Sequence, residues 1–173
     1  MKIVDNFLSS EDFYNLSHYI FSPDMHWVYT NFKVMDIENK DLMSSQLYHS
    51  FCDSFNRSSS VDILNPIVKK LNIIALNRIK ANLELYRGKE RHYSEFHYDY
   101  TNSTGIPNKG MTTSIFYINT NNGYTEFKDG TKIESVANRF VSFPSNTLHR
   151  GVTQTDTKKR VVINFNFYTE EGG

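Results

Sequence analysis

Three polar residues in the second half of the chain have types and a spacing that could hold a metal ion. His97 and Asp99 are separated by one residue, and His149 follows 52 residues after His97. Residues i and i+2 of a strand share a face, so an imidazole and a carboxylate can reach one ion from a rigid backbone. Two histidines and one carboxylate leave coordination positions open. This ligand set is the facial triad of non-haem Fe(II) oxygenases, and it also suits a catalytic zinc.

Arg160 lies 11 residues after His149 and begins a segment, 160–168, in which polar and apolar residues alternate. Arg160, Asn164 and Asn166 fall on one face, and the apolar residues 161, 163, 165 and 167 fall on the other. A polar inward face in a small barrel indicates a ligand cavity, where a guanidinium can hold a carboxylate bidentately. A zinc hydrolase would need a general base beside the metal, and no HExxH motif occurs. An oxygenase that uses 2-oxoglutarate needs a cation for the far carboxylate, and Arg160 meets that need.

The hydrophobic pattern predicts helices before residue 80 and strands after it. Ser9 or Ser10 can cap a helix over 11–20, and apolar spacing predicts further helices over 41–56 and 61–74. A short strand is expected at 26–29. Alternation then predicts strands over 81–87, 94–99, 112–119, 124–128, 131–135, 139–143 and 160–168. We therefore expect one α+β domain over 1–173, in which mainly helical support (1–80) packs on one sheet of a jelly-roll core (81–169).

These segments, taken in order, resemble a known family. The matching pieces are strand 83–86, the pair His97 and Asp99, strand 113–119, segment 123–127, strand 139–144, His149 and Arg160. In this order they resemble the 2-oxoglutarate- and Fe(II)-dependent oxygenases, and within them the prolyl 4-hydroxylase-like branch. Residues 4–9 also resemble the usual entry into the first helix of that family.

The resemblance implies a double-stranded β-helix with Fe(II) at one mouth. It implies that His97, Asp99 and His149 are the metal ligands, that Arg160 binds the distal carboxylate of 2-oxoglutarate, and that the hydroxyls of Tyr86 and Tyr117 help to hold this co-substrate. The alternation of 113–119 agrees for Tyr117, which would face inward. Either tyrosine could instead be an amphipathic core residue with its hydroxyl at the surface.

The activity implied by the resemblance is hydroxylation of an unactivated C–H bond with O2, releasing succinate and CO2. Asp99 favours hydroxylation, because halogenating relatives lack this carboxylate. Peptidyl proline is the leading substrate, and a free amino acid or small metabolite is the alternative. Two alternative functions are compatible with the same barrel: a non-catalytic cupin-like binding module and a metal-dependent hydrolase or isomerase. The turn-rich loop 100–110, which follows Asp99, is expected to act as a mobile lid.

Composition excludes several classes of protein. The chain has 173 residues, with 19 Lys and Arg against 19 Asp and Glu, so we expect no nucleic-acid partner. One cysteine, Cys52, cannot form an intrachain disulfide or a thiolate cluster. The sequence shows no signal peptide and no apolar run of 18 residues, which predicts a cytoplasmic protein without a membrane span. The oligomeric state does not follow from the sequence.

Overall fold

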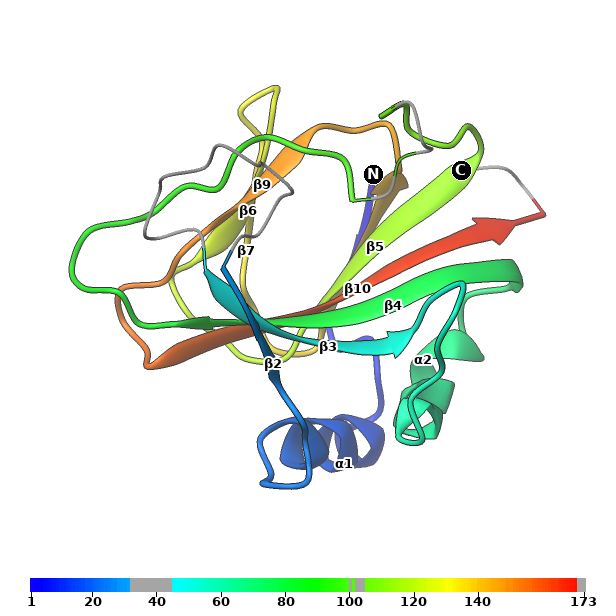
Figure 1. The fold of residues 1–173 in the computed structure, drawn as a ribbon, viewed down its shortest axis with the longest axis horizontal. Coiled ribbons are helices and arrows are strands. Elements are labelled where there is room, and N and C mark those ends of the chain that lie inside the picture. The colour runs from blue at the N-terminus through cyan, green and yellow to red at the C-terminus, as the bar shows by residue number, and fades with distance from the viewer. Residues whose placement is uncertain (32–44, 100, 102–104, 171–173) are drawn as a thin grey trace.

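The computed structural model describes residues 1–31, 45–99, 101 and 105–170 (Figure 1). Its elements in chain order are β1 (Lys2–Val4), α1 (Ser10–Ile20), β2 (Val28–Thr30), β3 (Gln46–Cys52), the 3-10 helix η1 (Val61–Leu64), α2 (Asn65–Val68), β4 (Ile73–Leu85), β5 (Met111–Tyr117), β6 (Tyr124–Phe127), β7 (Lys132–Glu134), β8 (Arg139–Pro144), β9 (His149–Val152) and β10 (Lys159–Thr169). No helix in these ranges has the length and apolar character needed to cross a membrane.

Two antiparallel sheets form the body of the described chain. The larger sheet has the order β1-β8-β5-β10-β4-β3-β2, and the smaller one has the order β7-β6-β9. Helices α1 and α2 lie on one side of the larger sheet, and the smaller sheet lies across its other side (Figure 1). The predicted mainly β, jelly-roll fold with helices on one sheet is therefore confirmed.

The helix-facing side of the larger sheet carries the main core. Val161, Ile163, Phe165 and Phe167 of β10 are all buried there. They form one cluster with Leu16 and Ile20 of α1 and with Leu64 and Ile67 of η1 and α2. Helix α1 begins as expected, because the Ser9 hydroxyl accepts a hydrogen bond from the backbone N–H of Asp12. The apolar residues of β10 thus lie on one face, under the helices, as the alternation of 160–168 predicts.

Two of the three predicted helices are wrong in whole or in part. Gln46–Cys52 is strand β3, while residues 41–44 lie outside the described ranges. Leu47 and Phe51 share a face of a helix and equally share a face of a strand, so their spacing could not separate the two. Helical structure over 61–74 ends at Val68, and β4 begins at Ile73. Residues 1–80 are therefore not mainly helical, because β3 and most of β4 belong to the central sheet.

Asn138 binds the N-terminal segment at Leu8 through its side chain. Its side-chain carbonyl accepts from the backbone N–H of Leu8, and its amide donates to the carbonyl of Leu8, both at 2.9 Å. These bonds are buried, and Asn138 has a left-handed backbone with φ 62°. These two hydrogen bonds hold the backbone of Leu8, just before α1, against the larger sheet.

We expect Asn138→Ala to lower the free energy of unfolding by about 2–3 kcal/mol more than the matched change Asn72→Ala, because it leaves the buried N–H and C=O of Leu8 unpaired. Asn72 is exposed and also left-handed, with φ 44°, so both changes share the backbone strain of alanine there. Urea denaturation measures both. Equal losses would show that these two hydrogen bonds contribute nothing net.

Candidate metal centre

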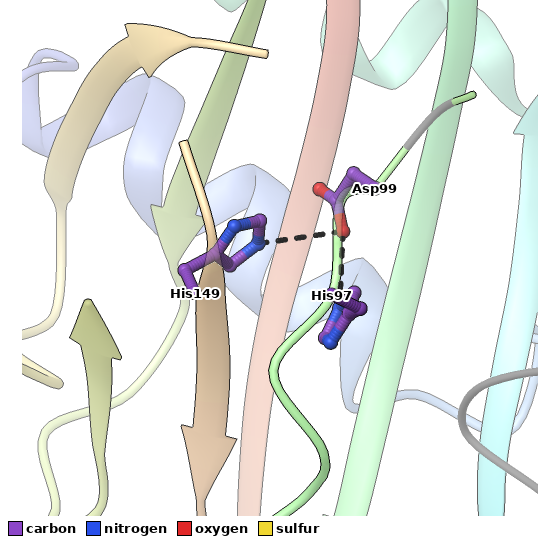
Figure 2. Close-up of side chains that lie close together, drawn as sticks. All are labelled: His97, Asp99 and His149. Carbon is purple, nitrogen blue, oxygen red and sulfur yellow. Dashed lines mark ion pairs between the residues drawn. The ribbon is translucent and has the colours of Figure 1, made fainter. Parts of the chain in front are cut away.

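The structure brings His97, Asp99 and His149 together at one point of the fold (Figure 2). Asp99 Oδ1 lies 3.5 Å from Nε2 of His97 and 3.5 Å from Nε2 of His149. One ligand atom from each residue lies within 4.8 Å of the other two. Donors that each sit about 2.0–2.2 Å from a shared ion have this kind of spacing. The donor set therefore fits one metal ion, and metal binding itself stays a prediction.

Backbone pairing holds the two histidines side by side. The N–H of His97 donates to the carbonyl of His149 at 2.9 Å, and the N–H of His149 donates back at 3.2 Å. His149 begins β9, but the strand expected over 94–99 is wrong, since only isolated bridges join Tyr93 to Val152 and His97 to His149. The segment from 93 to 97 has one residue more than the stretch of β9 that it follows, so the register shifts and regular pairing is lost.

The outer nitrogens of both imidazoles are fixed by backbone carbonyls. Nδ1 of His97 lies 2.9 Å from the carbonyl oxygen of Glu95, and Nδ1 of His149 lies 3.0 Å from that of Thr147. A carbonyl can only accept, so each Nδ1 carries the proton in these bonds. A metal ion would displace any proton on Nε2, and the lone pair of each Nε2 would then face that ion beside Asp99. This arrangement is how proteins set the tautomer of a metal-binding histidine.

Asp99 is a buried carboxylate whose two oxygens have different partners. Its side chain is 4% exposed; Oδ2 accepts from the amide of Asn164 at 3.0 Å, and Oδ1 faces the two histidines and, at 4.0 Å, Arg78. Burial alone would raise the pKa of Asp99, but the hydrogen bond and the charge of His149 hold it well below its usual range. Burial lowers the pKa of His149, and the bond to Asp99 outweighs this and raises it. Asp99 is thus ionised at neutral pH, as a metal ligand must be.

A cavity of about 600 Å³ opens in front of these residues, and Arg160 lines it. The Arg160 side chain is buried; its Nε donates to the Ser135 hydroxyl at 2.8 Å, and a terminal nitrogen lies 3.4 Å from the Thr125 hydroxyl. Within the described ranges no carboxylate lies within ion-pair distance of this guanidinium. Burial lowers the pKa of Arg160, and the cation stays charged at neutral pH. A buried cation without an acidic partner fits an anionic ligand.

Gly123 and Tyr117 shape the surroundings of Arg160. A Cβ atom on Gly123 would lie 2.8 Å from Cδ of Arg160 and 2.9 Å from the carbonyl oxygen of Val152, so only glycine leaves room for the arginine stem. Tyr117 is fully buried, and its hydroxyl donates at 2.8 Å to Thr125, whose oxygen also faces Arg160. Tyr117 faces inward as expected, but it reaches the cavity through Thr125. Gly123, Thr125 and Ser135 are not among the site residues predicted from the sequence.

Tyr86 is the predicted site residue that the structure does not bring to the cavity. It follows the last residue of β4, its backbone N–H donates to Lys158, and it is 48% exposed. Tyr86 continues the row of Arg78, Lys80, Asn82 and Glu84, which line the cavity at every second position of β4. The strand ends before Tyr86, however. These four wall residues were missed, although the alternation of 78–84 could have shown them.

Solved structures share this fold. A viral collagen prolyl hydroxylase from Paramecium Bursaria Chlorella virus-1, in complex with 2-oxoglutarate, is 16% identical, covers 98% of this chain and 96% of its own, and gives a TM-score of 0.60. A prolyl hydroxylase from Trichoplax adhaerens, bound to a hypoxia-inducible factor peptide fragment, is 14% identical over 99% of this chain and 84% of its own, with a TM-score of 0.67. The epimerase SnoN, bound to Fe3+, α-ketoglutarate and nogalamycin RO, is 10% identical over 96% and 78%, with a TM-score of 0.65.

No protein-family model matches the sequence, and no curated protein matches it. The similar solved structures show that the chain has the fold of 2-oxoglutarate-dependent oxygenases, in agreement with the resemblance found in the sequence. At these identities the likeness establishes the fold alone.

The metal centre predicts a graded loss of Mn(II) binding, measured by calorimetry with this redox-silent ion. His149→Ala should abolish binding, because it removes a ligand. Asn164→Ala should weaken binding about 10–100-fold, because Asp99 loses the amide that orients it. His92→Ala is the matched control, since His92 lies in the same segment outside the cluster. Unchanged affinity in the His149 variant would rule out this ligand set.

Proposed function

We propose that the protein is an Fe(II)- and 2-oxoglutarate-dependent dioxygenase that hydroxylates an unactivated C–H bond. One observation carries this proposal: the His97, Asp99 and His149 cluster shares a cavity with Arg160, a buried cation without a carboxylate partner within the described ranges. A metal triad alone would suit zinc as well as iron. The added cation supports a co-substrate that chelates the metal at one end and carries a second carboxylate at the other.

Each site residue then has a defined task. His97, Asp99 and His149 would hold Fe(II) and leave positions open, and Arg160 would pair with the distal carboxylate of 2-oxoglutarate. Ser135 and Thr125 fix the plane of the Arg160 guanidinium, so its donors are oriented before the ligand arrives. With O2, the bound iron and 2-oxoglutarate would supply oxidative decarboxylation to succinate and CO2 and the transfer of one oxygen atom to the substrate. The protein supplies orientation, charge and exclusion of water.

A prolyl ring is our leading substrate class. Two of the similar structures are prolyl hydroxylases, one of them bound to a peptide fragment. The same fold also carries the epimerase SnoN, so a free amino acid or a small metabolite is the second candidate. A non-catalytic cupin-like module is disfavoured, because it would not need a complete ligand cluster together with a buried arginine.

The test is an anaerobic titration with Fe(II) and then 2-oxoglutarate, followed by visible absorption. We expect a weak metal-to-ligand charge-transfer band that requires both additions. The band should be absent in His149→Ala. In Arg160→Met the affinity for 2-oxoglutarate should fall about 10–1,000-fold, because a charge-assisted bidentate pair contributes roughly 1.5–4 kcal/mol.

Arg57→Met is the control for a lost arginine charge, because Arg57 lies at the surface with its side chain 65% exposed. It should leave the band and the 2-oxoglutarate affinity unchanged. A folded wild-type protein that binds Fe(II) without developing a band would overturn the co-substrate assignment. A zinc enzyme or a non-catalytic module would then fit better.

A further inference from the structure

Besides Arg160, two cationic side chains line the cavity, Arg78 and Lys80, and the co-substrate does not account for Lys80. Lys80 of β4 pairs with Asn164 of β10, the residue that binds Asp99, whereas Arg160 pairs with Glu84 four residues further along β4. At about 3.3 Å per residue the two rows lie roughly 13 Å apart along the strand. Lys80 therefore stands in the row of the metal centre and does not belong to the distal-carboxylate pocket of Arg160.

The Lys80 ammonium is partly buried, and no described carboxylate forms an ion pair with it. Within the described ranges no carboxylate lies within 4.0 Å of it and no hydrogen bond engages it, and its nearest aromatic contact is the ring of Tyr48 at 4.7 Å. Burial, and then the charge of Arg78, lower the pKa of Lys80 to about 8, against an opposing effect of Asp99. The ammonium is charged at neutral pH, and a bound anion would relieve the cost of its burial.

Two hydrogen-bond acceptors lie beside Lys80 in the same cavity wall. The side-chain carbonyl oxygens of Asn82 and Asn164 are buried and have no hydrogen-bond partner among the described residues. The amide nitrogen of Asn164 donates to Asp99, which fixes the direction of its carbonyl oxygen. Lys80 and Asn164 are directly opposite each other across an antiparallel pair, so their Cα atoms are about 5 Å apart. The wall thus offers one cation and two acceptors within the reach of a small ligand.

We propose that Lys80, Asn82 and Asn164 form a substrate subsite for the α-carboxylate and the amino or imino group of a free amino acid. The carboxylate would pair with Lys80, and the N–H groups would donate to the two asparagine carbonyls. This inference rests on the proposed function and narrows its substrate: a residue inside a peptide chain has neither a free carboxylate nor a free ammonium at its own α-carbon. A free amino or imino acid has both, and it would lie next to the metal.

The experiment measures binding by calorimetry to protein loaded with Mn(II) and saturating 2-oxoglutarate, which fills the Arg160 end. The probes are free L-amino acids, L-proline among them, each paired with its carboxamide, and a capped peptide with an interior proline. We expect at least one acid to bind ten times more tightly than its amide and more tightly than the peptide. Lys80→Met should remove this preference, and Lys80→Arg, which keeps the charge, should retain it. Lys89→Met, an exposed lysine, is the matched control.

Three results would overturn the subsite: no acid preferred over its amide in the wild type, a preference that survives in Lys80→Met, or tighter binding of the capped peptide. A loss of 2-oxoglutarate affinity in Lys80→Met beyond twofold would also overturn it, because Lys80 would then hold the co-substrate. Failure of the proposed function gives a different result, in which the wild-type protein binds Mn(II) but no 2-oxoglutarate at all.

Discussion

The antiparallel pairing of β10 with β4 is the constraint on which the site depends. It runs over the full length of β10, from Lys159 opposite Leu85 to Thr169 opposite Ile73, and the two strands lie near the middle of the larger sheet. The register is constant from Lys159 to Asn166 and shifts beyond Asn166. Because side chains alternate, this register places the apolar residues under the helices and the polar residues in the cavity. A slip by one residue would exchange the two faces, placing Arg160 and Asn164 in the core. The core therefore selects the register that assembles the site.

Arg150, in the smaller sheet, supports the candidate metal centre from its outer side. Arg150 of β9 pairs with Glu126 of β6 at 2.7 Å, and its guanidinium lies 4.4 Å from the ring centre of Phe96 and 4.7 Å from that of Tyr93. These contacts of the Arg150 guanidinium with the two rings hold the irregular segment 93–97 against β9, where regular strand pairing is lost. His97 can thus face His149 without belonging to a strand. Arg150 thus contacts Glu126, Tyr93 and Phe96 on the outer side of the His97, Asp99 and His149 cluster, and its role is positional.

How much the sequence could predict follows from the range of the interactions. The alternation in 160–168 and the cap of α1 are local patterns, and both gave correct elements. The pair Leu47 and Phe51 fits a helix and a strand equally, and only pairing with β4 decides for a strand. The ordered motifs picked out four residues, His97, Asp99, His149 and Arg160, that the structure places around one cavity. Tyr86 lies outside that cavity because β4 ends at Leu85, an end set by its partner strands. Thr125 and Gly123 were missed because their importance lies in what they place around Arg160.

The charged side chains that line the cavity are not balanced in number. Arg78, Lys80 and Arg160 line it together with Asp99 and Glu84, so cations outnumber acids before a metal ion is added. Both acids already have partners. Asp99 contacts the two histidines and Asn164, and Glu84 pairs with Arg87. Burying this excess is costly, and a protein keeps such groups where a ligand compensates them. On the proposed function, a divalent metal would add to this positive excess, a dianionic co-substrate would offset the metal, and a further carboxylate would pair with the Lys80 ammonium. The positive excess in the cavity therefore favours anionic ligands.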